Sequence, residues 1–114
     1  MTNRTIPQNN EAEMAVLSTT FLSKKALDKV CEELCSEMFY LKSHQLLFNA
    51  ILELYNDNIP VDVTTVKDAL EKRHNLEAIG GIDYITEVID AVGTASNVDY
   101  YIDIVKEKAI LRSL

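Results

Sequence analysis

Apolar residues recur every three or four positions along almost the whole of this chain, a spacing that places them on one side of successive α-helices. The 114 residues include only three glycines and two prolines, so the chain lacks the turn residues typical of a β-sandwich. Apolar residues make up 47% and charged residues 25% of the chain, which is the balance of a globular protein. We therefore predict an all-α fold, a compact bundle of about six helices in one domain.

Capping residues indicate where the helices begin. An irregular N-terminal arm over residues 1–10, in which Pro7 forces an extended entry, is expected to precede a helical domain over 11–114. Asn10 is predicted to cap the first helix, and Glu13 three residues later completes a capping-box pattern. The predicted helices cover residues 11–21, 24–35, 42–56, 63–73, 82–92 and 97–114.

The remaining helix ends follow from single residues. Ser23, Asp62 and Ser96 are the predicted caps of the second, fourth and sixth helices, and Asn75 is expected to end the fourth helix in a left-handed conformation. Gly93 is expected to stop the fifth. The third helix has the widest apolar face, so we expect it to be the central helix. The sixth meets no stop signal, which indicates a domain cut from a longer protein.

The charge balance argues against a nucleic-acid-binding surface. Eleven Lys and Arg stand against 18 Asp and Glu, a net charge of −7, and the basic residues are scattered among acids. A domain that binds nucleic acid normally presents a basic face to the phosphates. Direct, tight binding of DNA by this chain alone is therefore disfavoured, and partners with basic surfaces are favoured.

Neither a membrane span nor an export signal is recognisable. Apolar runs fall short of the roughly 18 residues that cross a bilayer. The first residues are polar rather than arranged as a secretory signal. We therefore expect a cytoplasmic protein without a membrane partner.

The search for catalytic motifs indicates no enzyme. Gly80-Gly81 lacks the spacing of a phosphate loop and the Lys-Ser/Thr that ends one, so no cofactor is expected in this chain. His44 could be a general base or ligand, but no nucleophile is identifiable beside it, and we interpret it as a polar residue bonded to backbone near a helix end. Glu11 and Glu13 are interpreted as exposed or helix-capping charges.

Cys31 and Cys35 are four residues apart, which is one turn of a helix. A zinc site would need two further ligands, and the only histidines, His44 and His74, are distant in sequence. We predict that both cysteines are reduced, bind no metal and pack in or near the core.

Three tyrosines are candidates for an interaction surface. Tyr84 falls off the apolar stripe of its predicted helix. Tyr100 and Tyr101 are adjacent, so they diverge by about 100° and cannot both face one core. Exposed tyrosine is enriched at protein interfaces.

Seven short stretches, in order, carry a family resemblance over residues 6–114. They are Pro7-Gln8 with Glu11-Ala12-Glu13 and Ala15-Val16-Leu17; Phe39-Tyr40 with His44; Ile51 to Tyr55; Pro60-Val61-Asp62 with Thr65-Val66; Gly80-Gly81 with Tyr84; Asn97 with Tyr101; and Ile104 to Lys108 with Leu111-Arg112. In these stretches the chain resembles the N-terminal domain of bacterial replicative DNA helicases of the DnaB type. Ser18 stands where that family commonly has Gly, and Ser23-Lys24-Lys25 where it often has Asp-Pro.

The resemblance implies a function. The family has an all-helical head, a helical hairpin, of which our sixth helix would be the truncated start, and a RecA-like ATPase domain. Six copies form a ring whose N-terminal collar docks primase and can engage a loader. ATP and Mg would belong to the absent ATPase domain, and single-stranded DNA would be bound by the assembled ring, at the nucleoid. We expect this chain to have no ATPase activity. We also expect it to be a compact monomer or weak dimer rather than a hexamer.

The resemblance also suggests two partner-binding residues. Glu11 opens the first predicted helix and Tyr84 lies in the first turn of the fifth, and both are expected to help dock primase. The alternatives are that Glu11 only complements the helix dipole and that Tyr84 covers the edge of the core. For the whole chain, the alternatives are a stand-alone helical DNA-binding or adaptor domain and a small enzyme using His44.

Overall fold

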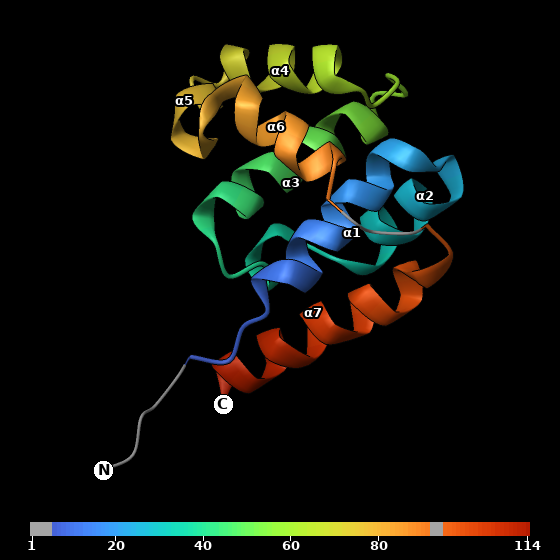
Figure 1. Ribbon diagram of the computed structural model, residues 1–114, viewed down its shortest axis with the longest axis vertical. Helices are drawn as coiled ribbons and strands as arrows, with labels where there is room; N and C mark the ends of the chain where they lie inside the picture. The colour runs from blue at the N-terminus through green and yellow to red at the C-terminus, as the bar shows by residue number, and fades with distance from the viewer. Residues whose placement is uncertain (1–5, 92–94) are drawn as a thin grey trace.

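The computed structural model describes residues 6–91 and 95–114, and every regular element in these two segments is helical (Figure 1). The all-α fold is therefore confirmed. None of the described helices is long and apolar enough to cross a membrane. In chain order the elements are α1 (Asn10–Leu22), α2 (Lys24–Glu33), the 3-10 helix η1 (Ser36–Met38), α3 (Lys42–Asn56), α4 (Val63–Lys72), α5 (Leu76–Ile79), α6 (Gly81–Ile89), the 3-10 helix η2 (Ala95–Asn97) and α7 (Val98–Ser113).

Helix α1 occupies the centre of the domain. It packs against α2, α3, α6 and α7, and Figure 1 shows it between α7 on one side and the layer of α4, α5 and α6 on the other. Eight of its residues are buried, including the whole run from Ala15 to Thr20. The prediction that the third helix is central was wrong, because α3 keeps an exposed side at residues such as Asn49.

Small and hydroxyl-bearing side chains allow α1 to be surrounded. The hydroxyls of Thr19 and Thr20 donate to carbonyl oxygens one turn earlier in α1, at 2.7 and 2.6 Å. The Ser18 hydroxyl lies within 3.3 and 3.2 Å of the carbonyl oxygens of Ile89 and Ala91, at the end of α6. Because buried hydroxyls need hydrogen-bond partners, these contacts let polar residues lie at the centre of the core.

Several predicted helix ends are confirmed, and their caps explain them. The Ser23 hydroxyl accepts from the Ala26 amide at 3.2 Å and starts α2. Asp62 and Thr65 form a reciprocal capping box at the start of α4. The third helix covers residues 42–56 as predicted.

Asn9, not Asn10, caps α1, because its side chain accepts from the Ala12 amide at 2.9 Å. The left-handed residue after α4 is His74, with φ 59°, whereas Asn75 has φ −107°. The extra helix α5 follows directly. Ser96 lies inside η2, and α7 begins at Val98.

The fifth predicted helix corresponds to α6, which ends at Ile89 rather than at residue 92. Its predicted stop, Gly93, lies outside the described residues.

The turn from α5 into α6 depends on two glycines. Gly80 has φ 107° and Gly81 has φ 75°, conformations that are costly for residues with a Cβ atom. A Cβ added to Gly80 would also lie 3.2 Å from the Tyr84 Cβ, whereas one added to Gly81 would meet nothing within 4 Å. Gly80 therefore sets how α6 enters the domain and where it holds Tyr84.

Replacing Gly80 with Ala should lower the free energy of unfolding by about 1–2 kcal/mol, because it combines backbone strain with the close Tyr84 contact. Gly81→Ala is the matched control. It should lower the free energy of unfolding by less, because it adds backbone strain without a close contact. Urea denaturation followed by circular dichroism measures both. A Gly80→Ala protein as stable as the parent would contradict this account of the turn.

Candidate functional site

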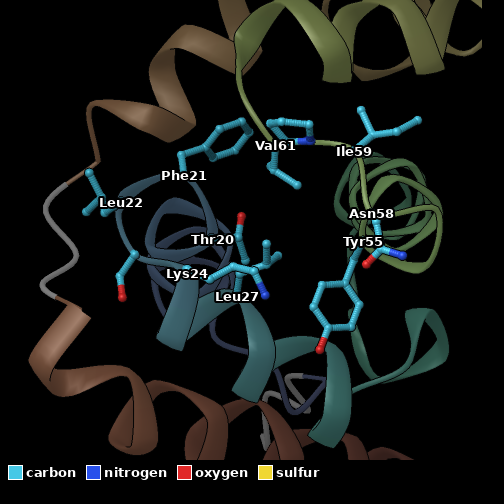
Figure 2. A pocket seen from close by; sticks show the side chains of 11 residues that line it. Thr20, Phe21, Leu22, Lys24, Leu27, Tyr55, Asn58, Ile59 and Val61 are labelled. Atoms are coloured by element: carbon cyan, nitrogen blue, oxygen red, sulfur yellow. The ribbon is translucent and has the colours of Figure 1, made fainter.

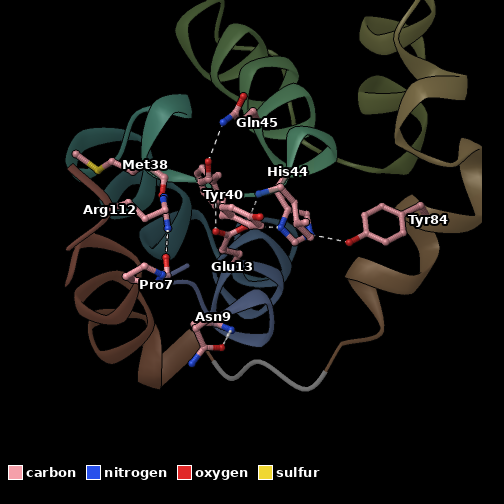
Figure 3. A network of polar contacts seen from close by, with 12 residues as sticks. Pro7, Asn9, Glu13, Met38, Tyr40, His44, Gln45, Tyr84 and Arg112 are labelled. Atoms are coloured by element: carbon pink, nitrogen blue, oxygen red, sulfur yellow. Dashed lines mark hydrogen bonds and ion pairs between the residues drawn. The ribbon is translucent and has the colours of Figure 1, made fainter. Parts of the chain in front are cut away.

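Three helices bring one polar side chain each to a single buried position. Glu13 comes from α1, His44 from the start of α3 and Tyr84 from α6, as Figure 3 shows. Glu13 is 2% exposed and His44 1% exposed. Together with the amides of Tyr40 and Leu41 they form what we call the Glu13 network.

The Glu13 carboxyl group is the acceptor at the centre of this network. Its Oε2 accepts from the Tyr40 amide at 2.6 Å, and its Oε1 lies 2.7 Å from His44 Nδ1 and, more weakly, 3.4 Å from the Leu41 amide. A buried carboxyl group without partners would cost several kcal/mol, so these donors are a condition of its burial.

The contacts assign a hydrogen-bond direction to His44. Because Glu13 Oε1 is an acceptor, Nδ1 of the imidazole carries the proton toward it. Nε2 lies 2.6 Å from the Tyr84 hydroxyl, within hydrogen-bond distance, and accepts from it when the imidazole is neutral. The imidazole therefore connects α1 to α6 through α3, with both ring nitrogens occupied.

Aromatic packing holds the imidazole in place. The rings of His44 and Tyr84 stack with centroids 5.9 Å apart and an interplanar angle of 25°, and the Phe39 ring meets His44 edge-on at 6.5 Å. Burial raises the pKa of the Tyr84 phenol above its usual range; the charges of Glu87 and Glu13 add to this, and a hydrogen bond to Ser43 opposes it. The hydroxyl therefore remains protonated at neutral pH.

Arg112, in the last turn of α7, attaches that helix beside the same network. Its guanidinium group donates to the carbonyl oxygens of Pro7 at 2.9 Å and Met38 at 2.7 Å. It also lies 5.5 Å from the centre of the Tyr40 ring, and the Tyr40 amide is a donor to Glu13. One set of polar contacts thus runs from α6 to the end of α7 (Figure 3).

This arrangement corrects two sequence interpretations. Glu13 is not an exposed or capping acid but a buried acceptor, and His44 contacts two side chains rather than backbone. Neither group reaches solvent to meet a substrate, so the network suits a structural role rather than general-base catalysis. Among residues 6–91 and 95–114 there is no cluster of three or more His, Cys, Asp or Glu able to hold a metal ion.

The two predicted docking residues lie in different environments. Glu11 is exposed in the first turn of α1. It lines a hollow of about 510 Å³ between α1 and α7, which Met14, Tyr101 and Ile104 also line. Tyr84 is half-buried, with its hydroxyl turned inward to His44. Within the described residues, no hydrogen bond or ion pair joins Glu11 to Tyr84.

The cysteines do not share a helical face. Helix α2 ends at Glu33, so Cys31 lies within it and the exposed Cys35 lies beyond it. Burial raises the pKa of the Cys31 thiol to about 12, which leaves it protonated and unreactive at neutral pH. Their reduced, metal-free state remains a prediction.

Comparison with known proteins places the chain in one group. The family model for the DnaB-like helicase N-terminal domain matches residues 5–107. The chain is 46% identical to the replicative DNA helicase DnaC of Bacillus subtilis over 100% of its own length and 25% of that protein. It is 47% identical to the replicative DNA helicase DnaB of Geobacillus stearothermophilus over 95% of its length and 24% of that protein. The chain therefore spans about a quarter of these curated relatives.

A solved structure agrees with the sequence comparison. The N-terminal domain of DnaB helicase from Mycobacterium tuberculosis superimposes with a TM-score of 0.90 at 44% identity, covering 95% of this chain and 78% of that one.

Removing the Tyr84 hydroxyl tests the Glu13 network. Tyr84→Phe keeps the ring but leaves His44 Nε2 without its hydrogen-bond partner, so the free energy of unfolding should fall by about 1–3 kcal/mol. Tyr100→Phe is the control, because Tyr100 is 72% exposed and its hydroxyl should matter little. Urea denaturation of both variants measures the difference. Equal stability of the two variants would mean that the hydroxyl is not part of the network.

Proposed function

Because this chain belongs to the family of DnaB-like helicase N-terminal domains, we propose that it is the interaction and assembly domain of a hexameric replicative DNA helicase. In this proposal six copies form the collar of a ring in the cytoplasm. The match to a solved N-terminal domain over 95% of the chain, at a TM-score of 0.90, is the observation that carries the proposal. Unwinding with ATP and Mg is assigned to a region outside these 114 residues, because the sequence contains no phosphate loop.

DNA is proposed to meet the assembled ring rather than this chain alone. The net charge of −7 supports this division, since a domain that holds the phosphate backbone by itself needs a cationic face. The alternative of a stand-alone DNA-binding domain would require a salt-dependent gel shift with the isolated chain.

Primase is the proposed partner of Glu11 and Tyr84, and a helicase loader is a further candidate. Glu11 supports the proposal by its exposure beside an open hollow between α1 and α7. Tyr84 supports it less directly. Its ring is partly exposed and could contact a partner, but its hydroxyl belongs to the Glu13 network. A rigid tyrosine with a charged rim is a common composition for a binding hot spot.

Glu11→Ala and Tyr84→Ala, made in the full-length helicase, should each weaken primase binding, with Tyr84→Ala costing about 1–2 kcal/mol. Tyr84→Ala also disturbs the Glu13 network, so calorimetric titration should be done well below the melting temperature of each variant. Tyr84→Phe controls for the loss of the hydroxyl alone, and Tyr100→Ala for loss of an exposed ring. Unchanged affinity for both alanine variants, with folding intact, would end the proposed role of these residues.

A further inference from the structure

The part of Tyr84 that is open to solvent is its ring rather than its hydroxyl. The side chain is half-buried, and its hydroxyl lies 2.6 Å from His44 Nε2 and also takes part in a hydrogen bond with Ser43. Figure 3 shows the hydroxyl pointing at the imidazole. One turn earlier stand Gly80 and Gly81, which have no side chains to cover the ring. A partner that meets Tyr84 therefore meets ring carbon atoms.

An acidic side chain accompanies this ring. Glu87 follows Tyr84 by three residues on α6, which places the two side chains on the same face of the helix. Burial raises the pKa of the Tyr84 phenol most, and the Glu87 charge raises it next. Glu87 is exposed, and it makes no ion pair among residues 6–91 and 95–114. Its charge therefore acts on the phenol without being neutralised by a cation.

The charges around α6 leave this surface negative. Residues 74–105 contain no lysine or arginine. The two lysines of α4, which packs against α6, each pair with an acid of their own helix. Lys42 lies at the start of α3, close in sequence to His44, but it has no part in the shift of the Tyr84 pKa. The surface of Tyr84 and Glu87 therefore complements a positively charged group.

The same domain contains a completed set of a tyrosine, an acid and a cation. The Lys24 Nζ lies 5.3 Å from the centre of the Tyr55 ring and 2.7 Å from the Asp28 carboxylate, and Asp28 also forms a hydrogen bond with Tyr55. Figure 2 shows Lys24 and Tyr55 at a hollow of about 430 Å³, which we call the apolar hollow beside Lys24. Its lining consists of residues 20–24, Leu27, Tyr55 and residues 58–61. Here the chain itself supplies the cation, and its charge is already paired.

Tyr84 and Glu87 supply a ring and an acid of the same kinds. In the part of the chain that the structure describes, a lysine or arginine lies over the rings of Tyr55 and Tyr40, and none lies over the ring of Tyr84. A cation is attracted to the face of a tyrosine ring, and a carboxylate beside the ring adds to that attraction. The hydrogen bond to His44 holds the Tyr84 ring in one orientation, so the ring is positioned before a partner arrives.

From this combination we propose that Tyr84 and Glu87 together bind a lysine or arginine side chain of the docked partner. The cation lies over the exposed part of the Tyr84 ring and pairs with the Glu87 carboxylate. The inference rests on the proposed docking of primase at Tyr84. It adds Glu87 as a residue that selects a basic side chain at that site.

The test measures primase binding to the full-length helicase by calorimetric titration at low and at raised salt. Glu87→Gln should weaken binding by about three-fold or more at low salt and by less at raised salt, because salt screens the same attraction in the parent protein. Glu87→Lys should weaken binding by about ten-fold or more, since it places a like charge against the cation of the partner.

Two substitutions of Tyr84 separate its aromatic face from its apolar area. Tyr84→Phe and Tyr84→Leu both remove the hydroxyl and with it the hydrogen bond to His44. Only Tyr84→Phe keeps an aromatic face, so it should bind primase about three-fold more tightly than Tyr84→Leu. Circular dichroism at the assay temperature checks that each variant is folded.

Glu32→Gln is the matched control for the loss of one acidic charge. Glu32 is exposed on α2, and its charge, after burial and Asp28, raises the pKa of Tyr55. The Tyr55 ring already has Lys24 over it, so removing the Glu32 charge should leave primase affinity unchanged.

The outcomes separate this inference from the proposed function on which it rests. If Tyr84→Ala weakens primase binding but Glu87→Gln binds as tightly as Glu32→Gln, Tyr84 docks primase and the bound cation is wrong. Equal affinities of Tyr84→Phe and Tyr84→Leu would also overturn the cation. If Tyr84→Ala binds primase as the parent does, the proposed docking role of Tyr84 and this inference both fail.

Discussion

The fold depends on a carboxyl group that is buried at the centre of the domain. Glu13 lies on the central helix, and its two oxygens can be satisfied only if the start of α3 and the residues just before it are held against α1. A buried acidic group adds little net stability compared with an apolar residue, but the wrong arrangement leaves it unpaired at a cost of several kcal/mol. The contribution of Glu13 is therefore to select one arrangement of α1 and α3.

The same requirement extends outward from Glu13 in two directions. Through His44 it reaches Tyr84, whose position on α6 is set in turn by the Gly80 turn. Through the Tyr40 segment it reaches Arg112, which attaches α7 to the residues before α1. Glu11 and Tyr84, which we propose to dock primase, therefore lie on α1 and α6, two helices that this polar network joins.

Much of the fold could be predicted from sequence because it follows local rules. The bounds of α3, the Ser23 cap and the Asp62 capping box depend on residues within one turn of each other. The position of Glu13 depends on α3, which lies about thirty residues further along the chain, so its three-residue spacing from Asn10 was misread as a local cap. Its spacing to Val16, Leu17 and Thr20 places it on a buried face, and that was the available signal.

The candidate site was predictable only in part, for a related reason. Tyr84 was singled out because it lies off an apolar stripe, but that pattern does not reveal that its hydroxyl turns inward to His44. His44 itself gave no sign of its partners, because both come from other helices. The apolar hollow beside Lys24 also joins residues 20–27 to residues 55–61, which no periodicity within one helix reveals.

The central claim is that Glu13 and His44 act as one unit, and a double-mutant cycle tests it most directly. Glu13→Gln, His44→Phe and the double variant would be compared by urea denaturation at neutral pH. The account predicts that the second substitution costs much less once the first is present, with a coupling of about 1 kcal/mol or more. Strictly additive losses in the free energy of unfolding would contradict it.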